Sequence, residues 1–188
     1  MRREENIILP VAAGLGLLIL LSDSGPGPGT SIGPVGLTPT NFIKRYWNEA
    51  LQDQKRTGIS ALFTITQAGL ESGWGKRAPR FNYFGIKADN SWDGETQLLD
   101  TTEYVNGKKV YVKALFRAYP SARHGFTDHS LFFFENPRYK NALLVRNDAI
   151  QFAKAIAKAG YATDPNYADK LIHAMKIVIT VLQRHGMI

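Results

Sequence analysis

The sequence predicts an α+β domain that is mostly helical and contains one inserted β-hairpin. Apolar residues recur at helical spacing just after residue 39, and helical patterns return in the last third of the chain. Between them, residues 96–117 alternate as strands do on either side of Asn106-Gly107, a strong hairpin signal. The two patterns together indicate a single domain of helices and one hairpin over residues 39–188.

Two helices are expected before the hairpin. Thr38 or Thr40 can cap the first, with Pro39 in its opening turn, and its apolar face carries Ile43, Tyr46, Trp47, Ala50 and Leu51. The second fits residues 58–72, and Gly73 can end it. One of its faces is apolar, and the opposite face is expected to be a polar stripe of Ser60, Thr64, Gln67 and Glu71.

The hairpin register follows from a two-residue turn at residues 106–107. That turn places Glu103 opposite Val110, and Asp100 opposite Lys113 as a cross-strand ion pair. Glu103 then shares one face of the sheet with apolar neighbours, namely Leu99, Val110, Val112 and Phe116. A carboxylate on an apolar face indicates either a functional role or a sheet-edge glutamate that reaches solvent.

Three further helices are predicted after the hairpin, at about residues 121–135, 148–159 and 165–185. Asp164 is expected to cap the last of them with Pro165 behind it, and Gly186 to end it. The pattern contains no internal repeat.

The first 38 residues differ from the rest of the chain. Residues 1–21 hold an apolar run of about 15 residues, shorter than the ~20 that span a bilayer. Because a positive flank and an Ala-x-Ala site are missing, we expect an uncleaved membrane anchor; a cleaved signal peptide and a buried core helix are the alternatives. Residues 22–38 are rich in glycine and proline and are expected to be a linker.

Charge and cysteine usage narrow the function only slightly. The chain has a formal net charge of +7 and no cysteine, so disulfides and thiolate metal sites are excluded. A basic surface fits an anionic partner such as lipid headgroups, acidic wall polymer or nucleic acid. Nothing but charge supports nucleic acid, so no such partner is expected.

Glu71 is the first candidate for catalysis. It closes the polar stripe beside Gly73-Trp74-Gly75, with aromatic residues soon after. A carboxyl at a helix C-terminus near bulky aromatics can be desolvated, and desolvation raises its pKa into the range that a glycosidase acid needs. On spacing alone, a solvated surface glutamate is the favoured interpretation.

A set of motifs in a fixed order changes that balance. The chain reads Leu-Glu-Ser-Gly-Trp-Gly at 70–75 and Asn-Tyr-Phe-Gly-Ile-Lys at 82–87, followed by Thr-Thr-Glu-Tyr at 101–104 and Phe-Arg-Ala-Tyr at 116–119. Further matches are Gly-Phe-Thr-Asp at 125–128, Asn-Pro-Arg-Tyr at 136–139 and Ala-Gly-Tyr-Ala-Thr-Asp-Pro at 159–165. This closely resembles glycoside hydrolase family 73, the peptidoglycan N-acetylglucosaminidases, over nearly all of residues 39–188.

The resemblance implies a fold and a reaction. The fold is lysozyme-like, with a mainly helical lobe and a small hairpin lobe flanking a cleft. The reaction is hydrolysis of the β-1,4 bond after N-acetylglucosamine in peptidoglycan, with Glu71 as general acid and Glu103 as the second catalytic carboxylate. Two routes remain at the anomeric carbon. If Glu103 activates water, the anomeric configuration is inverted; if the substrate's own acetamido group attacks, the configuration is retained. No cofactor is implied.

The remaining site candidates are aromatic or polar. Trp74, Tyr119, Tyr161 and Tyr167 are expected either to line the sugar groove or to pack in the core, and core packing is favoured for Phe84. Asp128 either orients the site or is a helix-surface aspartate. The residues His124 and His129 are expected at the surface rather than as metal ligands, so no metal site is predicted.

Three rival functions share part of this pattern. A lytic transglycosylase or muramidase uses a single glutamate on the alternate bond, a wall-binding module lacks turnover, and a nucleic-acid binder rests on charge alone. We expect the domain to face the cell wall, anchored in a bacterial envelope or a phage virion membrane, or secreted if the N-terminus is cleaved.

Overall fold

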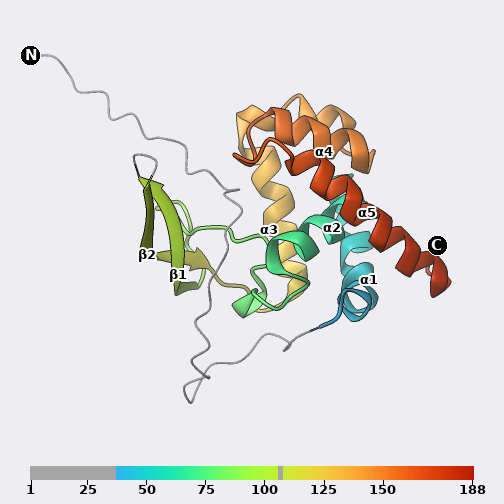
Figure 1. Cartoon of the computed structure of the whole chain (residues 1–188), viewed down its shortest axis with the longest axis horizontal. Coiled ribbons are helices and arrows are strands. Elements are labelled where there is room, and N and C mark those ends of the chain that lie inside the picture. The colour runs from blue at the N-terminus through green and yellow to red at the C-terminus, as the bar shows by residue number, and fades with distance from the viewer. Residues whose placement is uncertain (1–36, 106–107) are drawn as a thin grey trace, which may run out of the picture.

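The computed structural model describes residues 37–105 and 108–188 and confirms the α+β class (Figure 1). The predicted anchor at residues 1–21, nearly all of the predicted linker and the turn at 106–107 lie outside the described residues. Within the described residues, no helix combines the length and apolarity needed to cross a membrane. The helices gather on one side of Figure 1, and the hairpin stands beside them.

Helix α1 (Pro39–Thr57) begins as its sequence predicts. Thr38 Oγ1 accepts a hydrogen bond from the backbone N–H of Asn41 at 3.2 Å, and Pro39 occupies the first turn. The helix ends at Gly58, which has a left-handed φ of 74° and donates its N–H to the carbonyl of Gln54. Its apolar face is buried and includes Phe42, Ile43, Tyr46, Trp47 and Ala50.

Helix α2 (Ala61–Ser72) lies at the centre of the helical lobe and packs against α1, α4 and α5. The predicted polar stripe opposite the apolar face is itself largely buried. Thr64 and Gln67 are fully buried, and Ser60 is nearly so. Because neighbouring helices cover several sides of α2, its polar side chains face protein and need internal partners.

Strands β1 (Thr96–Val105) and β2 (Lys108–Arg117) pair antiparallel in the predicted register. Glu103 lies opposite Val110, and Asp100 lies opposite Lys113, whose Nζ is 3.0 Å from the Asp100 carboxylate. Asn82 ties the preceding loop to this sheet: its side chain donates to the carbonyls of Ile86 and Arg117.

The other helices are α3 (Ala122–Glu135), α4 (Ala149–Lys158) and α5 (Tyr167–Arg184), with short 3-10 turns η1 (Pro79–Phe81), η2 (Pro137–Tyr139) and η3 (Ala142–Val145). The predicted cap of α5 is wrong by two residues. Asn166 is the N-cap, while Asp164 accepts hydrogen bonds from the Asn166 N–H and from Lys170 Nζ. Pro165 and Asn166 form a separate turn, so the side chain of Asp164 stabilises that turn before the helix begins.

Two apolar clusters hold the helices together. The first joins α1, α2, the start of α3, the end of α5 and the 83–86 loop around Phe42, Tyr46, Tyr83 and Phe126. The second joins α2, α3, α4 and the start of α5 around Phe63, Phe133, Phe152 and Tyr161. Each fully buried large apolar side chain contributes roughly 1.5–3 kcal/mol of transfer free energy. Helix α2 contributes to both clusters, so its C-terminal end is firmly positioned.

Candidate active site

The last turn of α2 is shaped by the residues around Glu71. Gly73 ends the helix with a left-handed φ of 60°, and its N–H donates to the carbonyl of Gly69. Ser72 Oγ donates to the Ala68 carbonyl at 2.5 Å and accepts from the Gly75 N–H at 2.8 Å. The Glu-Ser-Gly sequence therefore builds a defined helix end, and the carboxyl group projects from a rigid turn.

Trp74 wedges this turn against the helix. A Cβ atom at Gly69 would lie 2.5 Å from the Trp74 ring, so the indole fits only because residue 69 is glycine. The ring also meets Phe42 edge-on, with centroids 6.0 Å apart. Trp74 has a φ of 60°, which is costly for a non-glycine residue and indicates a conformation imposed by packing. These contacts assign Trp74 a packing role, and its predicted contact with sugar stays a prediction.

Two tyrosines from the C-terminal part of the chain surround Glu71. Tyr167 donates its hydroxyl proton to Glu71 Oε1 at 2.5 Å, and Gln67 Nε2 donates to the same hydroxyl at 2.7 Å. Tyr161 stacks beside Tyr167, with centroids 5.5 Å apart. Because the Gln67 amide fills the acceptor position of the phenol, the Tyr167 proton is directed at Glu71. The structure thus brings three predicted site residues together, Glu71, Tyr161 and Tyr167.

This surrounding makes Glu71 an acid near neutral pH. Burial disfavours the ionised carboxylate and raises the pKa of Glu71 from an ordinary 4.5 to about 7. The Tyr167 hydrogen bond and the positive charge of Arg77 both lower it, but they do not overcome the desolvation. A carboxyl with this pKa can carry a proton at pH 7 and deliver it to a leaving oxygen.

The second predicted catalytic carboxylate is only partly described. The backbone of Glu103 lies in β1 opposite Val110, as the register predicts, but its side chain lies outside the described part of the molecule. On the same sheet face, Phe116 and Thr101 are buried, whereas Leu98, Tyr111 and Leu115 on the other face are exposed. Glu103 therefore belongs to the more buried face of the hairpin, and its role stays a prediction.

A second polar cluster holds the remaining predicted site residues. Asp128 accepts hydrogen bonds from Arg117 Nη1 at 2.9 and 3.0 Å and from the Tyr119 hydroxyl at 2.6 Å. The Arg117 guanidinium lies over the ring of Trp92, 4.5 Å from its centroid. Asp128 is therefore neither free on the helix surface nor bonded to Glu71. It joins α3 to the end of β2.

A cavity of about 690 Å³ adjoins this second cluster. Tyr119 and Asp128 line it together with Trp92, Arg123 and other residues of α3 and the 92–95 loop. Glu71, Tyr161 and Tyr167 are not among the lining residues. Glu71, Tyr161 and Tyr167 thus lie at the end of α2, and Tyr119 and Asp128 form a separate group beside α3.

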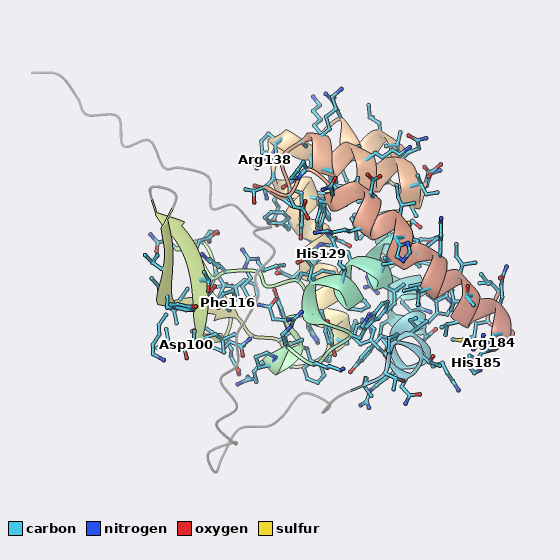
Figure 2. The ribbon with its side chains drawn as sticks, viewed as in Figure 1. Asp100, Phe116, His129, Arg138, Arg184 and His185 are labelled. Carbon is cyan, nitrogen blue, oxygen red and sulfur yellow. The ribbon has the colours of Figure 1, made fainter. Side chains whose placement is uncertain are left out.

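Phe84 and His129 form a buried stack that has no place in either group. Their rings are 3.6 Å apart and nearly parallel, and Phe84 is in the core as expected. The prediction that His129 lies at the surface is wrong: it is fully buried among the helices (Figure 2), and burial lowers its pKa to about 3. Its position on the buried side of α3, between the rings of Phe84 and Phe133, explains the error. His124 is exposed, as predicted.

No group of three or more metal-binding side chains occurs within residues 37–105 and 108–188.

No site role was predicted from the sequence for two residues of the polar clusters, Gln67 and Arg117. Gln67 is visible four positions before Glu71 on the same helix side, which is a usable signal. Arg117 carries no such signal, because its partner Asp128 is on another element.

Known proteins resemble this chain in both sequence and fold. Residues 47–178 match the family described as mannosyl-glycoprotein endo-beta-N-acetylglucosaminidase. The chain is 40% identical over 151 residues to the peptidoglycan hydrolase FlgJ of Salmonella typhimurium, which covers 77% of this chain and 48% of that protein. It is 37% identical over 159 residues to FlgJ of Vibrio parahaemolyticus, covering 81% of this chain and 52% of that protein. The chain therefore spans about half the length of these curated relatives.

The solved glycoside hydrolase domain of Salmonella typhimurium FlgJ superposes on this structure with a TM-score of 0.69 at 32% identity. The match covers 80% of this chain and 94% of that domain. It confirms the predicted lysozyme-like fold.

Proposed function

Because the chain belongs to the glucosaminidase family, we propose that it hydrolyses the β-1,4 bond after N-acetylglucosamine in peptidoglycan, with Glu71 as general acid. One observation carries this proposal: Glu71 is a desolvated carboxyl with a pKa of about 7, held by a tyrosine at a rigid helix end. A neutral carboxylic acid is the group that glycoside cleavage requires beside the leaving oxygen.

The hydrogen-bond chain at Glu71 supports a division of labour between its two oxygens. Oε1 accepts the proton of Tyr167, which is itself oriented by Gln67. Oε2 is then the oxygen that carries the transferable proton and meets the glycosidic oxygen. As the bond breaks, Glu71 becomes an anion, and the Tyr167 hydrogen bond and the Arg77 charge stabilise it, since both favour the ionised form.

The second half of the reaction falls to Glu103 or to the substrate. If Glu103 activates water, the anomeric configuration inverts; if the acetamido oxygen attacks, it is retained. Glu103→Gln should lower the rate strongly in the first case, and azide should restore part of it by replacing the activated water. In the second case we expect a modest loss without azide rescue. Wild-type activity in this variant would leave Glu103 as a solvent-facing residue.

The decisive experiment is digestion of purified peptidoglycan by wild type and Glu71→Gln. We expect the variant to lose on the order of 10²-fold or more in rate while unfolding at a similar temperature, because only the acid is removed. Borohydride-reduced products of the wild type should end in reduced N-acetylglucosamine. Reduced muramic acid would identify a muramidase, anhydro-muramic acid a transglycosylase, and no products at all a wall-binding module.

Membrane attachment is a separate proposal and rests on the apolar run of residues 1–21 with the Gly/Pro-rich segment behind it. The domain would then work at a bacterial envelope or a virion membrane, facing the wall. Deleting residues 1–24 should release the protein into the soluble fraction with unchanged hydrolysis of purified wall. A full-length protein that stays soluble without detergent, or one whose mature form begins near Gly25, would contradict an anchor.

A further inference from the structure

The guanidinium of Arg77 lies directly over the turn that follows Glu71. A Cβ atom at Gly73 would be 3.1 Å from Arg77 Nη2, 3.3 Å from Nε and 3.4 Å from Cζ. The Arg77 backbone is fixed as well, since its N–H donates to the Ser72 carbonyl at 2.9 Å. Because residue 73, two positions after Glu71, has no side chain, the planar guanidinium of Arg77 has room to lie against this turn.

This cation has no hydrogen-bond acceptor within residues 37–105 and 108–188, although it is only partly exposed. Three other arginines of the domain have hydrogen-bond acceptors. Arg56 donates to Asp53 and Thr127, Arg117 to Asp128, and Arg146 to two backbone carbonyls. A guanidinium offers five N–H donors in a planar fork that matches a carboxylate. At Arg77 those donors are available to a ligand.

The position is unfavourable for the acid when no ligand is bound. The positive charge of Arg77 favours ionised Glu71 and so lowers its pKa, which works against proton donation. An anion that pairs with Arg77 would offset this effect and let Glu71 hold its proton more tightly. Substrate binding and the protonation of the acid would then be coupled.

We propose that Arg77 is a specificity-determining residue that binds a carboxylate of the wall polymer next to the bond that Glu71 cleaves. The inference rests on the proposed hydrolase function and names the chemistry that the site selects. Peptidoglycan carries carboxylates on its peptide stems, and strands stripped of their stems carry one on each lactyl group. A neutral glycan offers neither.

The first test compares substrates with wild-type protein. Soluble glycan strands are prepared with intact stems, with all carboxylates converted to amides, and with stems removed by an amidase. We expect kcat/KM on intact strands to exceed that on amidated strands by about ten-fold or more, as a charge-assisted hydrogen bond predicts. Faster cleavage of intact strands than of amidated strands assigns a stem carboxylate. Faster cleavage of stripped strands than of amidated strands, with intact and amidated strands equal, assigns the lactyl carboxylate, which is free only once the stem is removed. Equal rates on all three substrates would overturn the proposal, whereas no cleavage of any strand would refute the hydrolase function.

The second test uses variants. Arg77→Gln should lose about ten-fold on intact strands and little on amidated ones, and Arg77→Lys should fall between them because it keeps the charge but not the fork. Lys76→Gln is the matched control, since it removes an exposed neighbouring charge and should discriminate like wild type. An equal loss on both substrates by Arg77→Gln would show a purely structural role. If that variant does not fold, the wild-type comparison still decides.

The pH profile separates binding from packing. Removing the Arg77 charge should raise the pKa of Glu71, so the alkaline limb of kcat/KM should move to higher pH in Arg77→Gln. In wild type with intact strands, the alkaline limb of kcat should lie above that of kcat/KM, because the bound carboxylate offsets Arg77. That separation should vanish with amidated strands. If the alkaline limb of kcat/KM lies at the same pH in Arg77→Gln as in wild type, the charge of Arg77 does not act on Glu71 and the electrostatic argument is contradicted.

Discussion

Glu71 and Asp128 are two carboxylates that each accept a hydrogen bond from a tyrosine, yet their surroundings differ. Tyr167 reaches Glu71 at 2.5 Å and Tyr119 reaches Asp128 at 2.6 Å. Asp128 is also ion-paired with the buried Arg117, whereas the hydrogen bond to Glu71 comes from a neutral relay that begins at Gln67. The difference teaches that Glu71 can hold a proton because desolvation outweighs both its tyrosine hydrogen bond and the charge of Arg77, which is not ion-paired with it, whereas Asp128 is held in a direct ion pair with Arg117.

The largest effect on stability is expected at Asp128. Asp128→Ala removes the hydrogen-bonded partner of the buried Arg117, which keeps only Asp89, at 3.9 Å, among the described residues, and it also removes the acceptor of Tyr119; together these should cost about 3 kcal/mol in unfolding free energy. Urea unfolding measures this, and the exposed Asp169→Ala serves as control. An Asp128→Ala protein as stable as wild type would remove the structural side of the comparison.

Replacing Glu71 should have the opposite effect on stability: Glu71→Gln should stabilise the protein as pH rises, because the effect of the wild-type carboxyl on stability depends on pH. Its folded pKa of about 7 lies above the ordinary 4.5, so the folded state binds its proton more tightly than the unfolded state. The stabilisation is therefore present below about pH 4.5 and is lost as pH rises through 7. Relative to wild type, Glu71→Gln should gain on the order of 1–3 kcal/mol between pH 4 and pH 8.5. A difference that does not change with pH would refute the raised pKa.

Tyr167→Phe tests the comparison by removing the tyrosine hydroxyl that donates to Glu71, while the corresponding hydroxyl of Tyr119 at Asp128 is kept. The hydrogen bond to Glu71 favours its ionised form, so its loss should raise the pKa and move the alkaline limb of kcat/KM upward. The side-chain amide of Gln67 also loses its acceptor, which should cost about 1–2 kcal/mol. Tyr119→Phe is the matched variant: it should lose stability to a similar extent and leave the position of the limb unchanged.

The smallest effect is expected for the exposed ion pair of the hairpin. Asp100 and Lys113 are 3.0 Å apart, but 70% and 63% of their side chains are exposed. Figure 2 shows Asp100 on the hairpin, away from the helices. Asp100→Asn should change the unfolding free energy by at most about 0.5 kcal/mol. A loss as large as that of Asp128→Ala would mean that burial does not distinguish the two ion pairs.

Local patterns predicted the elements and the helix ends well. The N-cap of α1, the end of α2 at Gly73 and the strand register were confirmed, because each depends on residues a few positions apart. The predictions that failed concern the cap of α5 and the burial of His129. His129 was expected at the surface, but it is buried among helices whose positions no local pattern contains, and the same packing buries much of the polar stripe of α2.

The sequence by itself determined the position of the proposed acid: Glu71 lies at the end of a helix, and Ser72 and Gly73 specify that end. Only the tertiary structure decided that Glu71 is an acid at neutral pH. Tyr167 is 96 residues away in the chain and Gln67 bonds to it across 100 residues. The raised pKa comes from desolvation, which is the combined effect of every atom that excludes water, so it exists only once the distant helices have packed together.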